Sequence, residues 1–340
     1  MQDCPIRTVI SGFATPMLAN PERRTFRGAI FDAQSQLVTE SQRTRHGDNE
    51  WNPDDPANCK EFNSAQKLSG RSLYLGHYTG HYGHFLLETL NRVWPLLTPG
   101  RVKLYDHFVF HPFLHDTPDP LSFSPAKVCF QAFGIDPARF HLIQQPTFFG
   151  QIDIPAPQFD INHSVNPVMT KVYQTILKHG LSMPTSKIGW FQRLRGWPDS
   201  GELKLYISRR KAKGYHPVEN DEQVQSVFKA MGFRIFHPEK WSFEQQLALI
   251  QRAHILAGTE GSALHNSVFM RPKCHVLTIG TPRVPSGRIL NQDLCNGLSG
   301  VQNHYIEFKG QETVNYSAIY DTQHLRLALN QWLIGLGESR

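Results

Sequence analysis

The stretch "FRIFHPEKWSFEQQLALIQRAHILAGTEGSALHNSVFM", residues 233–270, decides how the second half of the chain folds. The short apolar run "FRIF" indicates a strand, and "SFEQQLALIQRA" has the apolar spacing of a helix that opens with Ser242 and Gln245 as a capping box. "HILAG" indicates a second strand, and a glycine-bearing turn then leads into a predicted helix over residues 261–270. A strand, a helix and a second strand in succession predict a parallel βαβ unit.

The same alternation continues on both sides of that stretch. "LKLYIS" (203–208) and "CHVLTIG" (274–280) read as strands. "DEQVQSVFKAMG" (221–232) reads as a helix that ends at Gly232, and "TQHLRLALNQWLIGLG" (322–337) as a further amphipathic helix. We therefore predict a Rossmann-like domain over residues 181–340, which would bind a nucleotide.

The first half centres on "GHYTGHYGHFLLETLNRVW", residues 76–94. A strand at 73–75 is predicted to enter a glycine-rich turn, followed by a helix over 84–97 whose polar face carries His84, Glu88, Asn91 and Arg92. Strands at 107–112 and 139–143 flank a helix at 125–134. We predict an α/β domain over residues 1–180 with a largely parallel sheet, a crossing region near 170–200, and a long polar surface loop around residues 46–63.

Composition limits the function classes. A chain of 340 residues suits two domains, and its 40% hydrophobic and 19% charged residues exclude a disordered protein. A net charge of +6 favours an anionic partner, such as membrane head groups or a phosphorylated small molecule, and we expect no nucleic-acid partner. The five cysteines form no Cys-x-x-Cys pair, and the start of the sequence lacks a secretory signal pattern, so we expect a cytoplasmic protein.

Three histidines, His77, His81 and His84, fall within eight positions. Zinc is disfavoured because glycines interrupt the segment and no further ligand follows at a familiar spacing. Structural histidines and a substrate-facing loop both remain open. His84 and Glu88 favour the loop, since they lie one turn apart where the helix starts, at the carboxyl end of a strand, where α/β sheets bind ligands. Glu88 could instead pair with Arg92 at the surface.

Two turns in the second half suit an anion. The strand-to-helix turn that contains Glu260, Gly261 and Ser262 would expose backbone amides and the positive end of a helix dipole. Ser208 and Arg209 leave a strand at its carboxyl end, where a guanidinium could grip a diphosphate with two hydrogen bonds. Together these turns predict a cleft that holds a phosphorylated donor.

Two blocks of this sequence resemble the signatures of the glycosyltransferase 61 family. They are "GHFLLETLNRVWPLL" and the long block that runs from "LYISRRKAK" through "LAGTEGSALHNSVFM". The resemblance implies two Rossmann-like domains facing a cleft (the GT-B architecture), an inverting mechanism without metal, and, for bacterial members, a role in capsule or surface polysaccharides. Eukaryotic members usually carry His-Gly-Ala where this chain has Glu260, Gly261 and Ser262.

On this basis we expect transfer of a sugar from a nucleotide-sugar, with UDP as the expected nucleotide, to a glycan or lipid-linked acceptor. The reaction needs a base for the acceptor proton and positive charge for the leaving diphosphate. We assign the base to Glu88, oriented by His84, with His81 or Glu260 as reserves. The predicted donor-binding residues are Ser208, Arg209, Glu239, Ser242, Glu260, Gly261, Ser262 and Asn266.

Two alternatives stay open. The first is a non-catalytic partner subunit of the same fold. Glu260 keeps this hypothesis open, because its carboxylate would repel a diphosphate unless it is neutralised or points away. A zinc hydrolase that uses the three histidines is the third reading. The basic charge is compatible with contact to the inner face of the membrane, and the sequence indicates no oligomeric state.

Overall fold

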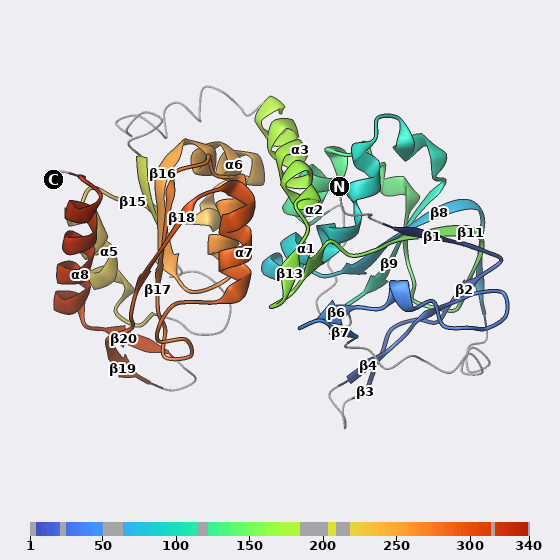
Figure 1. Cartoon of the computed structure of the whole chain (residues 1–340), viewed down its shortest axis with the longest axis horizontal. Helices are drawn as coiled ribbons and strands as arrows, with labels where there is room; N and C mark the ends of the chain where they lie inside the picture. Colours follow the sequence, from blue (N-terminus) through green and yellow to red (C-terminus); the bar gives the residue numbers. More distant parts are fainter. Residues whose placement is uncertain are drawn as a thin grey trace. The chain divides into compact units, whose positions relative to one another are not determined.

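The computed structural model describes residues 5–20, 25–49, 64–113, 122–183, 203–208, 218–313 and 317–338 (Figure 1). The chain divides into two compact units, Met1–His179 (unit 1) and Gly180–Arg340 (unit 2). Each unit has a mixed α/β fold built on parallel strands.

Unit 1 contains a seven-stranded sheet in the order β10-β9-β8-β11-β2-β5, with β1 also paired to β11. The four strands β8 to β11 run parallel, whereas β1 and β2 run antiparallel to β11. The strands are β1 (Ile6–Ile10), β2 (Phe13–Ala14), β5 (Ile30–Phe31), β8 (Gln66–Tyr78), β9 (His107–Pro112), β10 (Phe140–Leu142) and β11 (Thr147–Pro155). The sheet is therefore mixed and not largely parallel, because β1, β2 and β5, strands of two to five residues that were not predicted, join it.

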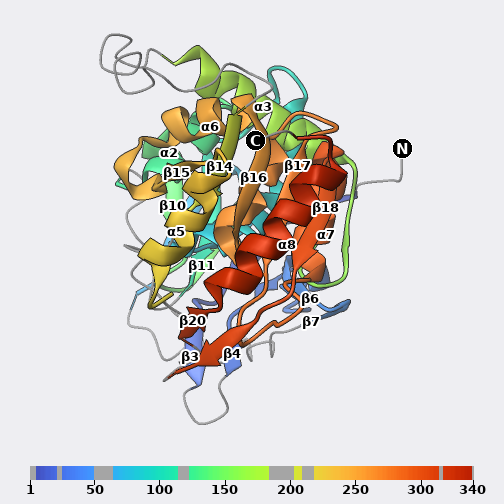
Figure 2. The ribbon, with the colours of Figure 1, turned by 90° about the vertical axis from the view of Figure 1, so that its left-hand side faces the viewer.

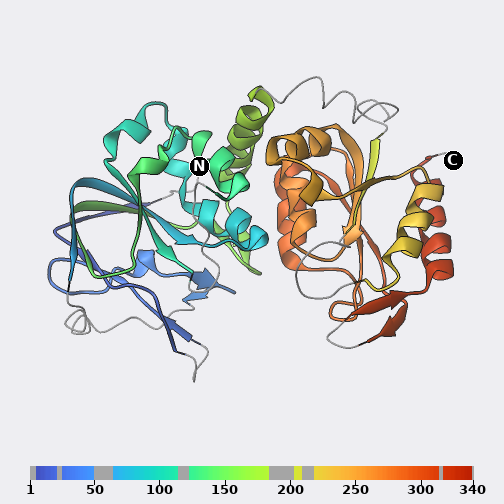
Figure 3. The same ribbon diagram turned by 180° about the vertical axis from the view of Figure 1, so that it is seen from behind.

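The other elements of unit 1 are short hairpins and helices. Figures 1 and 3 show the hairpin of β3 and β4 at the lower end of this unit. These elements are β3 (Leu18–Asn20), β4 (Thr25–Arg27), β6 (Thr44–Arg45), β7 (Asp48–Asn49), β12 (Phe159–Asp160), β13 (Ser164–Val165), η1 (Thr39–Ser41), η5 (Arg101–Leu104), η6 (Pro137–Arg139), α2 (Ser124–Gln131) and α3 (Val168–Ser182). The predicted crossing region thus starts as a regular helix, α3, with buried apolar residues on one face.

The prediction of one continuous helix over residues 84–97 is wrong. The chain forms α1 (Tyr82–Leu87) and then two 3₁₀ helices, η3 (Thr89–Arg92) and η4 (Trp94–Leu97), which has a proline in its first turn. Its expected polar face is also buried: Glu88 and Asn91 are 6% exposed and Arg92 is 2% exposed. The predicted surface pair of Glu88 with Arg92 does not form, because Arg92 donates to the carbonyls of Glu40, Gln42 and Pro155.

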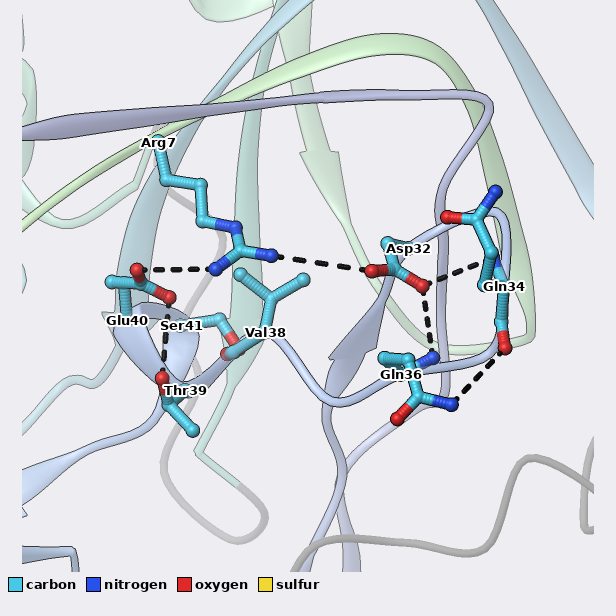
Figure 4. A network of polar contacts seen from close by, with 8 residues as sticks. All are labelled: Arg7, Asp32, Gln34, Gln36, Val38, Thr39, Glu40 and Ser41. Carbon is cyan, nitrogen blue, oxygen red and sulfur yellow. Dashed lines mark hydrogen bonds and ion pairs between the residues drawn. The ribbon is translucent and has the colours of Figure 1, made fainter.

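A polar network fixes the segment that covers this face (Figure 4). Arg7 of β1 reaches Glu40, with 3.4 Å between Nη1 and Oε1, and Asp32, with 4.0 Å between Nη2 and Oδ2. Asp32 in turn accepts hydrogen bonds from the backbone amides of Gln34 and Gln36. Just after Glu40, the Gln42 carbonyl accepts from Arg92, and Arg43 donates to Glu88.

Unit 2 contains a five-stranded, all-parallel sheet in the order β15-β14-β16-β17-β18. Numbered within the unit, that order is 2-1-3-4-5, which is one of the two common orders of doubly wound sheets. The strands are β14 (Leu203–Ile207), β15 (Arg234–Phe236), β16 (Ala253–Thr259), β17 (His275–Ile279) and β18 (Gln302–Ile306). Loops at the carboxyl ends of β14 and β16, where the order reverses, are the expected place for a ligand.

Helices cover both faces of that sheet. Figures 1 and 2 show α5 (Asp221–Ala230) and α8 (Thr322–Gly335) on one face, with α6 (Phe243–Arg252) and α7 (Leu290–Ser299) on the other. Phe228 of α5 stacks on Tyr206 of β14 with 4.1 Å between ring centroids, inside the apolar core between α5, α8 and the sheet. The remaining elements are η7 (Pro238–Lys240), η8 (Ser262–Phe269), β19 (Gly310–Glu312) and β20 (Ala318–Tyr320). The helix predicted over 261–270 is thus the 3₁₀ helix η8.

Candidate functional site

The first candidate site lies where α1 ends in unit 1. Glu88 follows α1 directly, and the imidazole Nδ1 of His84, one turn earlier, forms a short hydrogen bond with Glu88 Oε2. Arg43 binds the same carboxylate with two bonds, from Nε to Oε1 (2.6 Å) and from Nη2 to Oε2 (2.9 Å). Arg43 also lies over the ring of Phe113, 5.4 Å from its centroid. An imidazole, a carboxylate and a guanidinium are thus joined in one row.

Solvent reaches only one end of this row. The side chains of Glu88 and Arg43 are 6% and 8% exposed, whereas that of His84 is 36% exposed. Burial by itself would raise the pKa of Glu88, but hydrogen bonds from His84 and Arg43, with the charge of Arg43, lower this pKa to about 2. This environment opposes the predicted role of Glu88 as the general base, since a carboxylate with so low a pKa takes up protons poorly at neutral pH.

The other two histidines of the segment differ from His84. His81 is exposed and occupies the N-cap position of α1 without a side-chain capping bond, and its ring lies 4.9 Å from that of His84. His77 lies in β8 and is buried, and burial followed by the charge of Arg43 holds its pKa well below the usual histidine range. In the parts of the chain that the structure describes, no group of three or more His, Cys, Asp or Glu side chains could hold a metal ion.

The second candidate site is the turn between β16 and η8 in unit 2. Gly261 precedes η8 with φ of 144°, a value that L-residues with a side chain rarely adopt. Ser262 is the first residue of η8, and both residues are partly exposed. The glycine therefore lets the chain turn sharply and begin a helix at the carboxyl edge of the sheet, as the sequence suggested.

Glu260 at this turn has a cationic partner. Its carboxylate is 2% exposed and lies 2.5 Å from Nη2 of Arg283, which comes from the loop after β17. Arg283 itself is 52% exposed. The guanidinium thus offsets the negative charge of Glu260 at this turn.

Ser208 lies in a buried polar cluster at the end of β14. Its hydroxyl donates to Asp221 Oδ2 at 2.9 Å and accepts from Gln225 Nε2 at 3.1 Å, and Gln225 also donates to Asp221 at 2.5 Å. This cluster joins β14 to the first turns of α5. Arg209, the predicted diphosphate residue beside it, lies outside the described residues.

The three remaining predicted donor residues have local contacts. Ser242 caps α6 in a capping box with Gln245, so its alternative capping role is what the structure shows. Asn266 is 2% exposed and donates to the carbonyl of Ala263, which braces η8 from within. Glu239, on η7, is 39% exposed and lies 3.8 Å from His237 Nδ1.

Comparison with known proteins identifies the family. The sequence profile of glycosyltransferase 61 matches residues 82–277, which is more than half of the chain and includes α1 and the β16–η8 turn. The chain belongs to the glycosyltransferase 61 family. No curated protein matches. Among solved structures, E. coli heptosyltransferase WaaC with ADP has 12% identity and a TM-score of 0.29, covering 78% of this chain and 99% of that chain, a likeness too weak to support an argument.

A glycosyltransferase must deprotonate an acceptor hydroxyl and bind a leaving group. Two arginines that pair with predicted site carboxylates, Arg43 with Glu88 and Arg283 with Glu260, were missed from the sequence. They lie 45 and 23 positions from their carboxylate partners, so no local spacing indicated either pairing.

Among the residues that the structure describes, none of the helices has the length and apolar composition that a membrane span requires.

Proposed function

We propose that this glycosyltransferase inverts the sugar it transfers, works without a metal ion, and uses His84 as its general base. One observation carries the proposal: a buried carboxylate, held by Arg43, accepts a hydrogen bond from His84 Nδ1 while the imidazole stays partly exposed. Because Glu88 is ionised, the proton between them belongs to Nδ1. Nε2 is then the nitrogen that can accept a proton.

The proposed reaction is a single displacement. The acceptor oxygen attacks the anomeric carbon, the bond from that carbon to the leaving phosphate breaks, and His84 Nε2 takes the hydroxyl proton. Glu88 orients the ring and stabilises the imidazolium that forms, as a carboxylate does beside a catalytic histidine. Arg43 keeps Glu88 ionised and in place. The roles of His84 and Glu88 are therefore the reverse of those expected from sequence.

Unit 2 would bind the donor, a nucleotide-sugar with UDP as the first nucleotide to test. The β16–η8 turn supports this assignment because it combines Gly261 and Ser262 at a helix start with a cationic partner, Arg283, for Glu260. The acceptor would be a glycan or a lipid-linked saccharide in surface polysaccharide assembly, at the cytoplasmic face of the membrane. The family supports the assignment of a surface polysaccharide acceptor, and the net charge of +6 supports a location at the membrane.

The test is calorimetry of the full chain against UDP, GDP and CMP, followed by hydrolysis and transfer assays with sugar donors of the nucleotide that binds. We expect one nucleotide to bind and Glu88→Gln to lose turnover with its nucleotide affinity unchanged. A glutamine would turn its NH₂ group toward His84, which then keeps its proton on Nε2 and cannot act as a base.

His324→Ala is the matched control, because it removes a partly buried histidine of α8 that belongs to neither candidate site. It should leave binding and turnover unchanged. Absence of binding to all three nucleotides, or full turnover in Glu88→Gln, would contradict the proposal.

A further inference from the structure

The loop after β17 presents Arg283 on a rigid support. Thr281 and Val284 exchange backbone hydrogen bonds of 3.1 and 3.0 Å, which closes a tight turn around the arginine. The turn is anchored from neighbouring elements: Phe308 N donates to Pro285 O at 2.7 Å, and the Tyr320 hydroxyl donates to the carbonyl of Gly280 at 2.7 Å.

Gly280 shows how closely this loop is packed. A Cβ at that position would lie 1.9 Å from the carbonyl oxygen of Pro285, so only glycine allows the two backbone segments to pack this closely. The backbone that carries Arg283 is therefore fixed before any ligand arrives, and a ligand does not have to order it.

Arg283 has hydrogen-bonding capacity left after pairing with Glu260. Nη2 serves the carboxylate, and within the described part of the chain neither Nη1 nor Nε makes a hydrogen bond. The side chain is 52% exposed although its partner is 2% exposed. A guanidinium has five N–H donors in a planar fork, so a second anion can bind beside the first.

The pair of Glu260 and Arg283 lies at the edge of the sheet where ligands bind in this class of fold. Thr259, at the end of β16, pairs with Ile279, at the end of β17, so Glu260 and the loop with Arg283 leave the sheet side by side. This is the carboxyl edge of a doubly wound sheet, and the turn with Gly261 lies on it.

We infer that Arg283, aimed by Glu260, binds the diphosphate of the donor. The inference rests on the proposed function and adds to it a specific anion-binding residue. Glu260 acts as a positioning residue: it fixes one edge of the guanidinium and leaves the others to the phosphate oxygens. Its negative charge also reduces the net positive charge of the site, so the leaving nucleoside diphosphate can dissociate after transfer.

The two partners should therefore have effects of opposite sign. Arg283→Ala removes the cation and leaves the Glu260 carboxylate facing the ligand, so affinity for inorganic pyrophosphate should fall roughly 10- to 100-fold. Glu260→Gln keeps an oxygen that accepts from Arg283 but removes a negative charge, so pyrophosphate should bind more tightly. A pair that served only the fold would weaken stability in both variants and change affinity in neither.

The experiment is calorimetry of the full chain with inorganic pyrophosphate and with the nucleotide that binds the wild type. The matched control is Arg288→Ala, which removes another arginine of the same loop, 70% exposed and paired with Asp293. It should leave both affinities unchanged. Because Arg283→Ala strands a buried carboxylate, Arg283→Lys and the double variant Arg283→Ala/Glu260→Gln keep the test valid if the single variant does not fold.

Each outcome decides a separate claim. Arg283→Lys should retain part of the affinity, and the double variant should bind better than Arg283→Ala. If wild type binds a nucleotide and folded Arg283 variants bind it equally well, the assignment of Arg283 fails and the proposed function stands. If wild type binds neither nucleotide nor pyrophosphate, the proposed function fails, and the assignment with it.

Discussion

The two units each pair a carboxylate with an arginine, but they expose opposite parts of the pair. In unit 1 both Glu88 and Arg43 are buried, and the group left in contact with solvent is the imidazole of His84. In unit 2 only Glu260 is buried, and Arg283 itself is half exposed. The ion pair of unit 1 thus leaves an imidazole in contact with solvent, and the ion pair of unit 2 leaves a guanidinium.

The two arginines also differ in how many hydrogen bonds they donate to their carboxylates. Arg43 donates two hydrogen bonds to Glu88, and His84 forms a third, so the charges of Glu88 and Arg43 are satisfied among these three residues. Arg283 gives Glu260 one donor. A fully satisfied row orients a neighbour, whereas a partly used guanidinium attracts an anion.

Replacing His84 should have the largest effect. His84→Ala should reduce sugar transfer by about 10²- to 10⁴-fold, the usual contribution of a general base. Nucleotide affinity should not change, because unit 2 is intact. Steady-state rates and calorimetry on one preparation measure both. Equal losses in affinity and rate would break the proposed division of roles.

Replacing Arg43 should have the next largest effect, and it acts on stability. Arg43→Ala leaves Glu88 buried beside no guanidinium, which should lower the free energy of unfolding by about 3–5 kcal/mol. Arg7→Ala is the matched control, because Arg7 is 42% exposed in its pair with Glu40 and should cost about 0–1 kcal/mol. Urea titrations of both variants make the comparison. Similar losses would show that burial does not distinguish the pairs.

The pH dependence of stability sharpens the comparison. Folding lowers the pKa of Glu88 from 4.5 to about 2, so its contribution is complete above pH 4.5 and disappears as the pH falls toward 2. The free energy of unfolding of wild type relative to Glu88→Gln should therefore drop by about 3 kcal/mol across that range. Denaturation curves at several pH values test this, and a constant difference would mean that the carboxylate is not held ionised.

Ser242→Ala should have the smallest effect. Loss of the cap of α6 should cost about 1 kcal/mol of stability, without a change in nucleotide affinity. The predicted contact of Ser242 with a nucleoside would instead reduce affinity while α6 kept its stability. Thermal unfolding and calorimetry separate these two outcomes.

Elements specified by nearby residues were predicted well from the sequence. The strand expected at 107–112 is β9, and the capping box of Ser242 and Gln245 starts α6 as expected. Both depend on patterns a few residues long. Segments whose polar residues are buried were not predicted. Gln292 of α7, for example, is 1% exposed and bonds to Leu264, Ser267 and Asn296, and no short sequence pattern indicates this burial.

The candidate site divides in the same way. His84 and Glu88, one turn apart, and the Gly261 turn carry a local signal, so they could be selected from the sequence. The arginines that set their chemistry come from distant segments, and only the folded chain joins them. The contact with Arg43 is the reason why we propose His84 and not Glu88 as the base. The contact with Arg283 is the reason why we propose that Glu260 is compatible with a diphosphate.

The tautomer of His84 tests the central claim most directly, and it needs no knowledge of donor or acceptor. In a ¹⁵N-histidine-labelled protein at pH 8, the two ring nitrogens of His84 can be assigned by comparison with His84→Ala. We expect the proton on Nδ1, bonded to Glu88, and an unprotonated Nε2. A proton on Nε2 with Nδ1 unprotonated would contradict the account, because the nitrogen assigned to the acceptor hydroxyl could not then take its proton.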